Sequence, residues 1–167
     1  MIQVCAWCGS EIGKITSRYP ESELSHGICR SCYDNMRFQA GAPLSDYLDG
    51  LPVPVYVVND DAVVQGTNRA GLEMVGKEPN EVVGRYGGDV FECAYARLPG
   101  GCGRTVHCSG CTIRRTVTRT FETGEAQSRV PAVLRYGESE SPTPVNLRIT
   151  TAKIQGFVLL RVDEMVQ

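Results

Sequence analysis

Residues 53–65 read VPVYVVNDDAVVQ, and this stretch decides the fold class. Two runs rich in valine, residues 53–58 and 62–65, flank the turn-forming triplet Asn59-Asp60-Asp61. β-branched and aromatic side chains favour strands, whereas Asn and Asp favour tight turns. The stretch therefore predicts a β-hairpin.

Helices are predicted after this hairpin. Asn68 is placed to cap a helix that carries Leu72 and Val75, and residues 78–81 (EPNE) predict the start of a second short helix. A longer helix that ends near Gly124 is predicted from apolar residues at i, i+4 and i+8. These residues are Ile113, Val117 and Phe121.

Three more strands are predicted in the last third of the chain. Residues 127–136, 144–151 and 156–162 are rich in Val, Leu, Ile and Thr, and turn-forming stretches separate them. The order is then two strands, several short helices, one longer helix and three strands. Helices and strands that are segregated along the chain in this way indicate an α+β domain.

Length and composition restrict the class of protein. The 167 residues are enough for one domain and a small additional module, and 42% hydrophobic with 22% charged residues is typical of globular proteins. The formal net charge of −2 gives no general attraction for a nucleic acid. No apolar run reaches the roughly 20 residues of a membrane helix, and the first five residues lack the features of a signal peptide. We therefore expect a cytoplasmic protein with neither a membrane nor a nucleic acid as its partner.

The eight cysteines fall into two groups of four. Since a cytoplasmic protein keeps its thiols reduced, metal binding or redox chemistry is expected in preference to structural disulfides. The first group is Cys5-x2-Cys8 and Cys29-x2-Cys32, with twenty residues between the pairs. This is the spacing of a tetrahedral four-cysteine zinc site. We expect these four cysteines to bind zinc in a module of residues 1–40 that depends on the metal to fold.

A resemblance supports this interpretation of the first group. Residues 4–8 (VCAWC) and 24–32 (LSHGICRSC) resemble the small zinc-binding segment of bacterial signalling proteins, which has proline at the position of Arg30. His26 is an alternative ligand, although a surface or supporting position is the preferred interpretation for it. Residues 39–43 (QAGAP) are the predicted linker to the second domain.

The second cysteine group lies in a glycine-rich insertion, residues 93–111, and its members are Cys93, Cys102, Cys108 and Cys111. Five arginines and no acidic residue lie between Cys93 and Phe121. Their positive charge would offset four thiolates on an ion or a cluster, but it equally fits the solvated face of a helix. The five are Arg97, Arg104, Arg114, Arg115 and Arg119.

Three chemistries fit this second group. An iron–sulfur cluster accepts four thiolates with variable spacing, and zinc accepts the same four, with His107 as a substitute ligand. The third chemistry is a thiol switch, in which Cys111 at the start of the longer helix has a lowered pKa and Cys108 is the resolving partner. A metal centre is the preferred interpretation, and the sequence leaves its identity open.

The second domain resembles a PAS domain. Residues 47–59 (YLDGLPVPVYVVN) are similar to its opening strand, residues 66–72 (GTNRAGL) to the turn into its first helix, and residues 101–111 (GCGRTVHCSGC) to a cysteine-rich subset of bacterial PAS domains. The resemblance covers residues 44–164. It implies a five-stranded antiparallel sheet with short helices over one face, a pocket between them, and a homodimer formed through this domain.

The leading hypothesis is a stand-alone cytoplasmic sensor or adaptor that is not an enzyme, and whose second cysteine group changes self-association or the binding of a protein partner. Nucleotide-binding glycine motifs and a kinase phosphoacceptor context are missing from the sequence. One alternative is a transcriptional regulator that binds DNA through the zinc module, but four basic and four acidic residues cancel within residues 1–40. Another is a small thiol redox protein that uses Cys108 and Cys111, although the βαβ context of a thioredoxin fold is missing.

Overall fold

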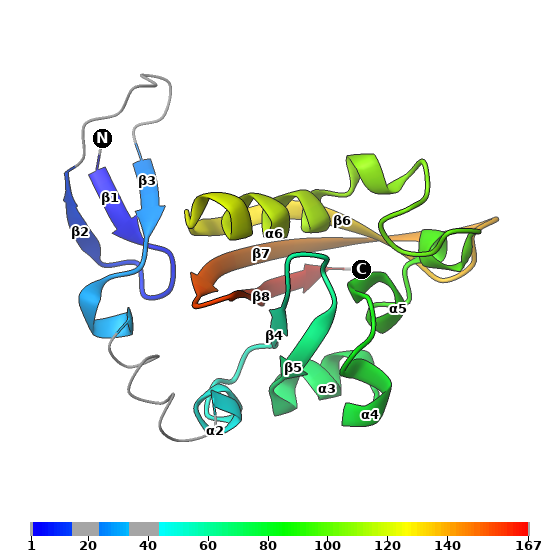
Figure 1. The fold of residues 1–167 in the computed structure, drawn as a ribbon, viewed down its shortest axis with the longest axis horizontal. Coiled ribbons are helices and arrows are strands. Elements are labelled where there is room, and N and C mark those ends of the chain that lie inside the picture. Colours follow the sequence, from blue (N-terminus) through cyan, green and yellow to red (C-terminus); the bar gives the residue numbers. More distant parts are fainter. Residues whose placement is uncertain (1, 15–23, 34–43, 167) are drawn as a thin grey trace.

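The computed structural model describes residues 2–14, 24–33 and 44–166, and its main element is a five-stranded antiparallel sheet (Figure 1). The strand order across the sheet is β5-β4-β8-β7-β6. The strands are β4 (Val55–Val58), β5 (Val64–Thr67), β6 (Gln127–Tyr136), β7 (Thr143–Ile154) and β8 (Phe157–Val166). Each overlaps a strand predicted from the sequence, and β7 and β8 run beyond the predicted ends. The α+β fold class is therefore confirmed.

A series of short helices and one longer helix connects β5 to β6. They are α3 (Arg69–Val75), α4 (Pro79–Val82), α5 (Gly87–Val90), the 3-10 helices η1 (Ala94–Arg97) and η2 (Cys108–Gly110), and α6 (Thr112–Thr123). The helix α2 (Leu44–Asp49) precedes β4. As predicted, the Asn68 side chain caps α3 by accepting a hydrogen bond from the Gly71 amide, and Gly124 ends α6 with a φ of 74°.

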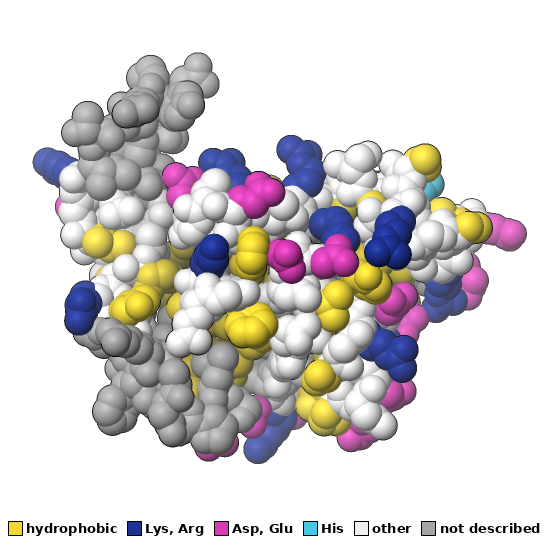
Figure 2. Space-filling view, viewed as in Figure 1, with side chains coloured by type: hydrophobic (Ala, Val, Ile, Leu, Met, Phe, Trp, Pro, Cys, Tyr) yellow, Lys and Arg dark blue, Asp and Glu magenta, His cyan; other side chains and the backbone are white. Residues whose placement is uncertain are grey.

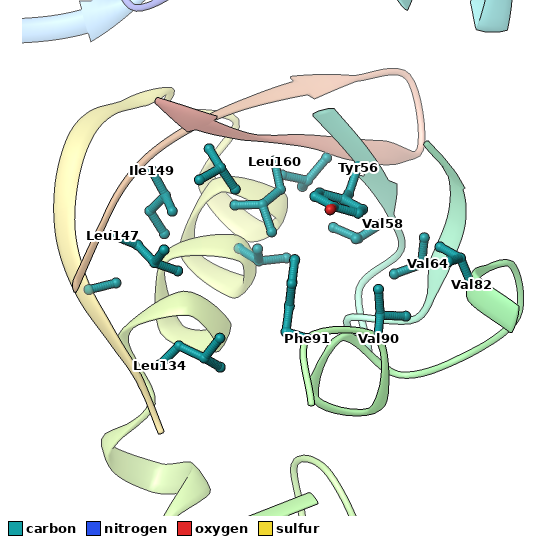
Figure 3. Packing of buried hydrophobic residues seen from close by; sticks show 14 of the residues in the cluster. Tyr56, Val58, Val64, Val82, Val90, Phe91, Leu134, Leu147, Ile149 and Leu160 are labelled. Carbon is teal, nitrogen blue, oxygen red and sulfur yellow. The ribbon is translucent and has the colours of Figure 1, made fainter. Parts of the chain in front are cut away.

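The main core lies between the sheet and the helices, and α6 contacts β6, β7 and β8 (Figure 1). Apolar side chains from the sheet and from the α4 and α5 region point into one space beneath α6 (Figure 3). Val117 of α6 is buried there, and the Thr120 and Thr151 hydroxyl oxygens lie 2.7 Å apart and join the helix to β7. Because the core is close-packed, a displacement of α6 requires the facing side chains to repack.

The opposite face of the sheet, called the outer face below, carries a second apolar cluster. Its buried members are Leu48, Val55, Val57 and Leu159. Leu48 belongs to α2, whereas Val55, Val57 and Leu159 belong to β4 and β8. Trp7 from the N-terminal module also packs against this cluster. Both faces of the sheet are therefore covered in part.

The N-terminal module is a small three-stranded sheet beside the turn that joins β7 and β8 (Figure 1). Its strands are β1 (Ile2–Cys5), β2 (Glu11–Lys14) and β3 (Leu24–Gly27), in the order β2-β1-β3. The linker expected at residues 39–43 lies outside the described residues. Within the described ranges, no helix is long and apolar enough to span a membrane.

Candidate metal and thiol centres

The first cysteine group is drawn together in the N-terminal module. The Sγ atoms of Cys5, Cys8, Cys29 and Cys32 all lie within 4.8 Å of one another. Parallel pairing of β1 with β3 causes this convergence, because it sets Cys5 opposite Gly27 and places the two Cys-x2-Cys turns at the same end of the module. This quartet can hold a metal, as the spacing of the cysteines predicts.

The geometry of this quartet fits a tetrahedral ion. In a zinc site with Zn–S bonds of about 2.3 Å, neighbouring sulfur atoms lie about 3.8 Å apart, and the Sγ atoms of Cys8 and Cys29 are 3.7 Å apart. Backbone amides support the sulfurs, since Cys29 N donates to Cys5 Sγ at 3.3 Å and Cys32 N donates to Cys29 Sγ at 3.4 Å. His26 lies on β3 outside the quartet.

The four thiols differ in acidity. Hydrogen bonding with the Ser10 hydroxyl, whose oxygen lies 3.0 Å from Cys8 Sγ, lowers the pKa of Cys8 to about 6. The Cys32 amide lowers the pKa of Cys29, whereas burial raises the pKa of Cys32. Thiolates are the ligand form that a metal requires, so the module supports that form at Cys8 and Cys29 before any ion arrives.

The second cysteine group surrounds a cavity. Cys93, Cys102, Cys108 and Cys111 all line a space of about 490 Å³ between α6, the loop before it and strands β6 to β8. Cys93 is held by an isolated bridge to Tyr136 at the end of β6, and Cys111 is the N-cap of α6. Cys102 and Cys108 come from the glycine-rich loop between them. The segment bridged to the end of β6, the glycine-rich loop and the start of α6 therefore meet at this cavity.

The second group is more widely spread than the first. Across residues 2–14, 24–33 and 44–166, the N-terminal quartet is the only set of three or more Cys, His, Asp or Glu whose ligand atoms all approach within 4.8 Å of one another. The four cysteines of the second group share a cavity instead of converging to that extent. Their joint ligation of one centre stays a prediction.

The pKa shifts in the second group reverse one expectation. Burial raises the pKa of Cys111 and also that of Cys102. The prediction that a helix N-terminus lowers the pKa of Cys111 is therefore wrong, because desolvation of the thiolate outweighs the helix amides. At Cys108, burial acts in the same direction, but hydrogen bonds from Thr105 and from the Gly103 amide, at 3.1 Å, lower its pKa overall.

The arginines of this segment separate into two kinds. Arg97 pairs with Glu92 and Glu138, and Arg119 pairs with Glu125, so these two belong to surface ion pairs. Arg104 and Arg115 are exposed. Arg114 donates to Asp61 at 2.9 Å and lines the cavity. Its positive charge opposes the burial that raises the pKa of Cys102, and it adds to the hydrogen bonds that lower the pKa of Cys108. Arg135 and Arg148 border the cavity through their strands, but both side chains are exposed and alternate with the core residues Leu134 and Leu147, so their charges lie on the other face of the sheet.

Two glycines make the close packing of this centre possible. A Cβ atom on Gly88 would lie 2.8 Å from Cys102 Sγ, and one on Gly103 would lie 2.0 Å from an Arg114 guanidinium nitrogen. Gly103 also has a φ of 86°, a conformation that side chains other than glycine rarely adopt. The sequence indicates a flexible loop here, but only the contacts show that these glycines position a cysteine and an arginine.

His107 lines the same cavity as the four cysteines, and its role as a substitute ligand stays a prediction. Its ring stacks on Tyr95, with the ring centroids 3.8 Å apart and an angle of 11° between the planes. The side chain is exposed at the rim of the cavity. The stacked pair therefore forms part of the cavity wall next to Cys108.

Comparison with known proteins identifies the larger domain. The family described as the PAS fold matches residues 48–160. None of the curated proteins compared with the chain is significantly similar to it.

Two solved structures with TM-scores of 0.50 or more have the same fold, and a third is also similar to this chain. A domain of the sensory box sensor histidine kinase/response regulator from Geobacter sulfurreducens is 13% identical with a TM-score of 0.51, and the match covers 78% of this chain and 98% of that one. The PAS domain of nitrogen regulation protein NR(II) from Vibrio parahaemolyticus is 9% identical with a TM-score of 0.50, over 74% and 98% of the two chains. The photoactive yellow protein domain of the sensor histidine kinase Ppr from Rhodospirillum centenum is 19% identical with a TM-score of 0.46, over 77% and 99%. The family match over residues 48–160 and the five-stranded antiparallel sheet with its covering helices agree. This chain therefore belongs to the PAS fold family.

Proposed function

We propose that this chain is a signal-sensing or adaptor protein whose input is the cysteine-lined cavity of its PAS domain. The observation that carries the proposal is that Cys93, Cys102, Cys108 and Cys111, from separate segments, all line one cavity beneath the start of α6. A structural site needs no cavity, whereas a site that responds to its occupant needs space and a neighbouring element whose packing the occupant can change. The loop supplies the space, and α6 supplies the neighbour.

The two cysteine groups are proposed to hold different metals. The N-terminal quartet, whose sulfurs all lie within 4.8 Å of one another, fits a single zinc ion that stabilises the module. An iron–sulfur cluster is wider than one ion, so its four thiolates stand further apart around a larger space. The wider spread of the second group, and the hydrogen bonds to Cys108 Sγ from Gly103 and Thr105, favour a cluster over a second zinc.

Charge and polarity around the cavity agree with this assignment. Four thiolates on a [4Fe–4S] core leave a net negative charge, and the Arg114 guanidinium supplies positive charge beside Cys102 and Cys108. The remaining lining is largely apolar, including Phe91 and Leu160, and this limits the access of water. When bound, the cluster would supply a change of oxidation state or its own loss as the signal.

The output is proposed to pass through α6. Cys111 immediately precedes the first turn of this helix, and Val117 and Thr120 bury the same helix against the sheet. Such packing adopts discrete arrangements, so a change of ligation at Cys111 favours one arrangement over another. We expect the result to be altered self-association as a homodimer, or altered binding of a protein partner. We expect no enzymatic activity, and a cytoplasmic location.

Recognition of DNA receives no support from the face of the molecule seen in Figure 2. Acidic and basic side chains are interspersed over the face seen in Figure 2. The described part of the N-terminal module presents Lys14 and Glu11 on the same strand. A DNA-binding surface requires a concentration of positive charge, so a protein partner is the preferred proposal.

Anaerobic purification tests the metal assignments. We expect one zinc per chain, together with about four iron and four acid-labile sulfide per chain and a broad visible absorbance that air removes. Cys102→Ser should lose the iron and keep the zinc, while the matched variant Cys29→Ser should lose the zinc and keep the iron. Two zinc ions per chain would instead assign zinc to the second group. A metal-free second group with a Cys108–Cys111 disulfide would establish the thiol switch.

A second measurement tests the signalling role. Light scattering should give different oligomeric states for the cluster-loaded protein and for the same protein after air oxidation, with the N-terminal zinc still bound. Identical oligomeric states and identical partner binding in the two forms would mean that the second cysteine group only stabilises its loop.

A further inference from the structure

The metal-binding turn of the N-terminal module lies directly against the PAS sheet. Trp7 stands between two of the four cysteines, in the turn Cys5-Ala6-Trp7-Cys8, and its side chain packs against the apolar cluster of the outer face. The guanidinium of Arg161 on β8 lies 4.6 Å from the centroid of the indole ring. Stacking of this kind is attractive, and more so where water is excluded.

Arg161 also binds the backbone of the same turn. Its Nη1 donates to the Trp7 carbonyl at 3.1 Å, and its Nη2 donates to the Ala6 carbonyl at 3.4 Å. Both acceptors are peptide groups within the Cys5-x2-Cys8 turn. Arg161 therefore contacts both the backbone of the turn and the indole ring of Trp7.

The sheet fixes the position of Arg161. Its Nε donates to Asp163 Oδ1 at 2.6 Å, and Asp163 Oδ2 accepts a hydrogen bond from the Thr150 hydroxyl at 2.6 Å. The two charged side chains are only 15% and 8% exposed. A charged group with this little exposure needs partners for its donors, and the carbonyls of the turn supply them.

The module depends on its metal for the shape of this turn. Among its described side chains, only Cys5 and Ala6 are buried. A segment with so small an apolar core obtains its folding free energy from the ion that its cysteines bind. Without the ion, the two carbonyls are no longer held toward Arg161.

We propose that the Cys5–Cys8 turn is a clasp that the N-terminal metal holds onto the outer face of the PAS sheet, so that metal occupancy controls whether Trp7 is docked there. The inference rests on the metal proposed for the first quartet. Release of the clasp leaves Arg161 without its two carbonyl partners and removes Trp7 from the cluster of Val55, Val57 and Leu159. Docked and undocked states of the clasp therefore differ in the burial of Trp7 and in the hydrogen bonding of Arg161.

The single tryptophan of the chain makes the clasp directly measurable, because all tryptophan emission comes from Trp7. Zinc is removed from the full-length protein with a chelator, and elemental analysis confirms the removal. We expect the emission of Trp7 to shift to longer wavelength and its quenching by acrylamide to increase. Re-addition of zinc should reverse both changes, while the thermal transition of the PAS domain remains.

Arg161→Lys separates docking from metal binding. Lysine keeps the charge beside Asp163 but cannot donate to both carbonyls and stack on the ring. The variant should retain its zinc and yet show stronger quenching of Trp7, with the undocked population raised about tenfold by the loss of a charge-assisted hydrogen bond. Arg85→Lys, at an exposed position on the PAS domain, is the matched control and should behave as the wild type.

The outcomes distinguish the two proposals. If zinc is removed, the PAS domain remains folded and Trp7 emission and quenching are unchanged, the clasp is wrong while the zinc site stands. If the protein binds no zinc, the zinc site itself is wrong, and metal control of the clasp fails with it. If Arg161→Lys does not fold, the chelation experiment on the wild type still decides the question.

Discussion

Asn68 is predicted to be the most sensitive polar position in the PAS domain. Its side chain is 0% exposed and holds three segments together. Oδ1 accepts hydrogen bonds from Val55 N at 3.0 Å and Gly71 N at 2.9 Å, and Nδ2 donates to the carbonyls of Leu48 at 2.9 Å and Val53 at 2.8 Å. The residue thereby joins α2, the start of β4 and the first turn of α3.

Replacement of Asn68 by Ala leaves the buried backbone amides of Val55 and Gly71 without an acceptor. At about 1–3 kcal/mol for each unsatisfied group, the free energy of unfolding should fall by about 4 kcal/mol. For a chain of this size, that loss corresponds to a thermal midpoint lower by roughly 8–16 °C. Urea denaturation followed by circular dichroism measures the change. The exposed Asn80 on α4 is the control, and N80A should stay within about 0.5 kcal/mol of the wild type. A loss below about 1 kcal/mol for Asn68→Ala would show that the network carries little stability.

Asn68→Asp adds a pH dependence with a defined sign. The new carboxyl keeps the acceptor at this position but lies in a fully buried site facing two carbonyl oxygens, so burial raises its pKa in the folded state. The protonated form then folds more favourably than the charged form. Destabilisation relative to the wild type should therefore be largest at neutral pH and should diminish as the pH falls toward the unfolded-state value of about 4. A pH-independent difference would contradict this account.

Two further changes test the cysteine loop and the end of α6. Gly88→Ala places a Cβ atom 2.8 Å from Cys102 Sγ and should lower the free energy of unfolding by about 1–3 kcal/mol. In the control Gly110→Ala, the new Cβ atom has nothing within 4 Å, so the loss should be less than about 0.5 kcal/mol. Equal losses in the two variants would refute the clash at Gly88. Lys153→Met keeps an apolar side chain but loses the 2.6 Å hydrogen bond to the Phe121 carbonyl and the stacking of the ammonium over the Phe121 ring. Urea denaturation should show a free energy of unfolding lower by about 1 kcal/mol. An unchanged midpoint would refute a stabilising role for this contact.

The sequence predicts most of the fold because its local signals agree with the tertiary structure. The valine-rich runs form β4 and β5, Asn68 caps α3 as expected, and the i, i+4, i+8 stripe of Ile113, Val117 and Phe121 lies on α6. The convergence of Cys5, Cys8, Cys29 and Cys32 also follows from sequence, because two Cys-x2-Cys turns leave few other arrangements. These features depend on near neighbours in the chain or on a short repeated motif.

Other features depend on contacts between segments that are distant in the chain. Burial of Cys111 beneath the loop reverses its expected pKa shift, and no local pattern reports that burial. The contact between Trp7 and Arg161 joins residues more than 150 positions apart. The cavity shared by Cys93 and Cys102 likewise exists only after Gly88 allows Cys102 to approach. Periodicity and spacing carry no information about such contacts.

The difference between the two cysteine groups also explains why sensing is assigned to the second. In the first, pairing of β1 with β3 brings all four sulfurs to one point, so a metal bound there would hold the module in a single arrangement. In the second, Cys93 is anchored at the end of β6 and Cys111 at α6, while Cys102 and Cys108 belong to a loop. A centre bound there must join a fixed strand, a packed helix and an adaptable loop. We propose that loss of such a centre would remove a restraint between these elements while the sheet stays folded, and a change confined to one restraint is what a two-state switch requires.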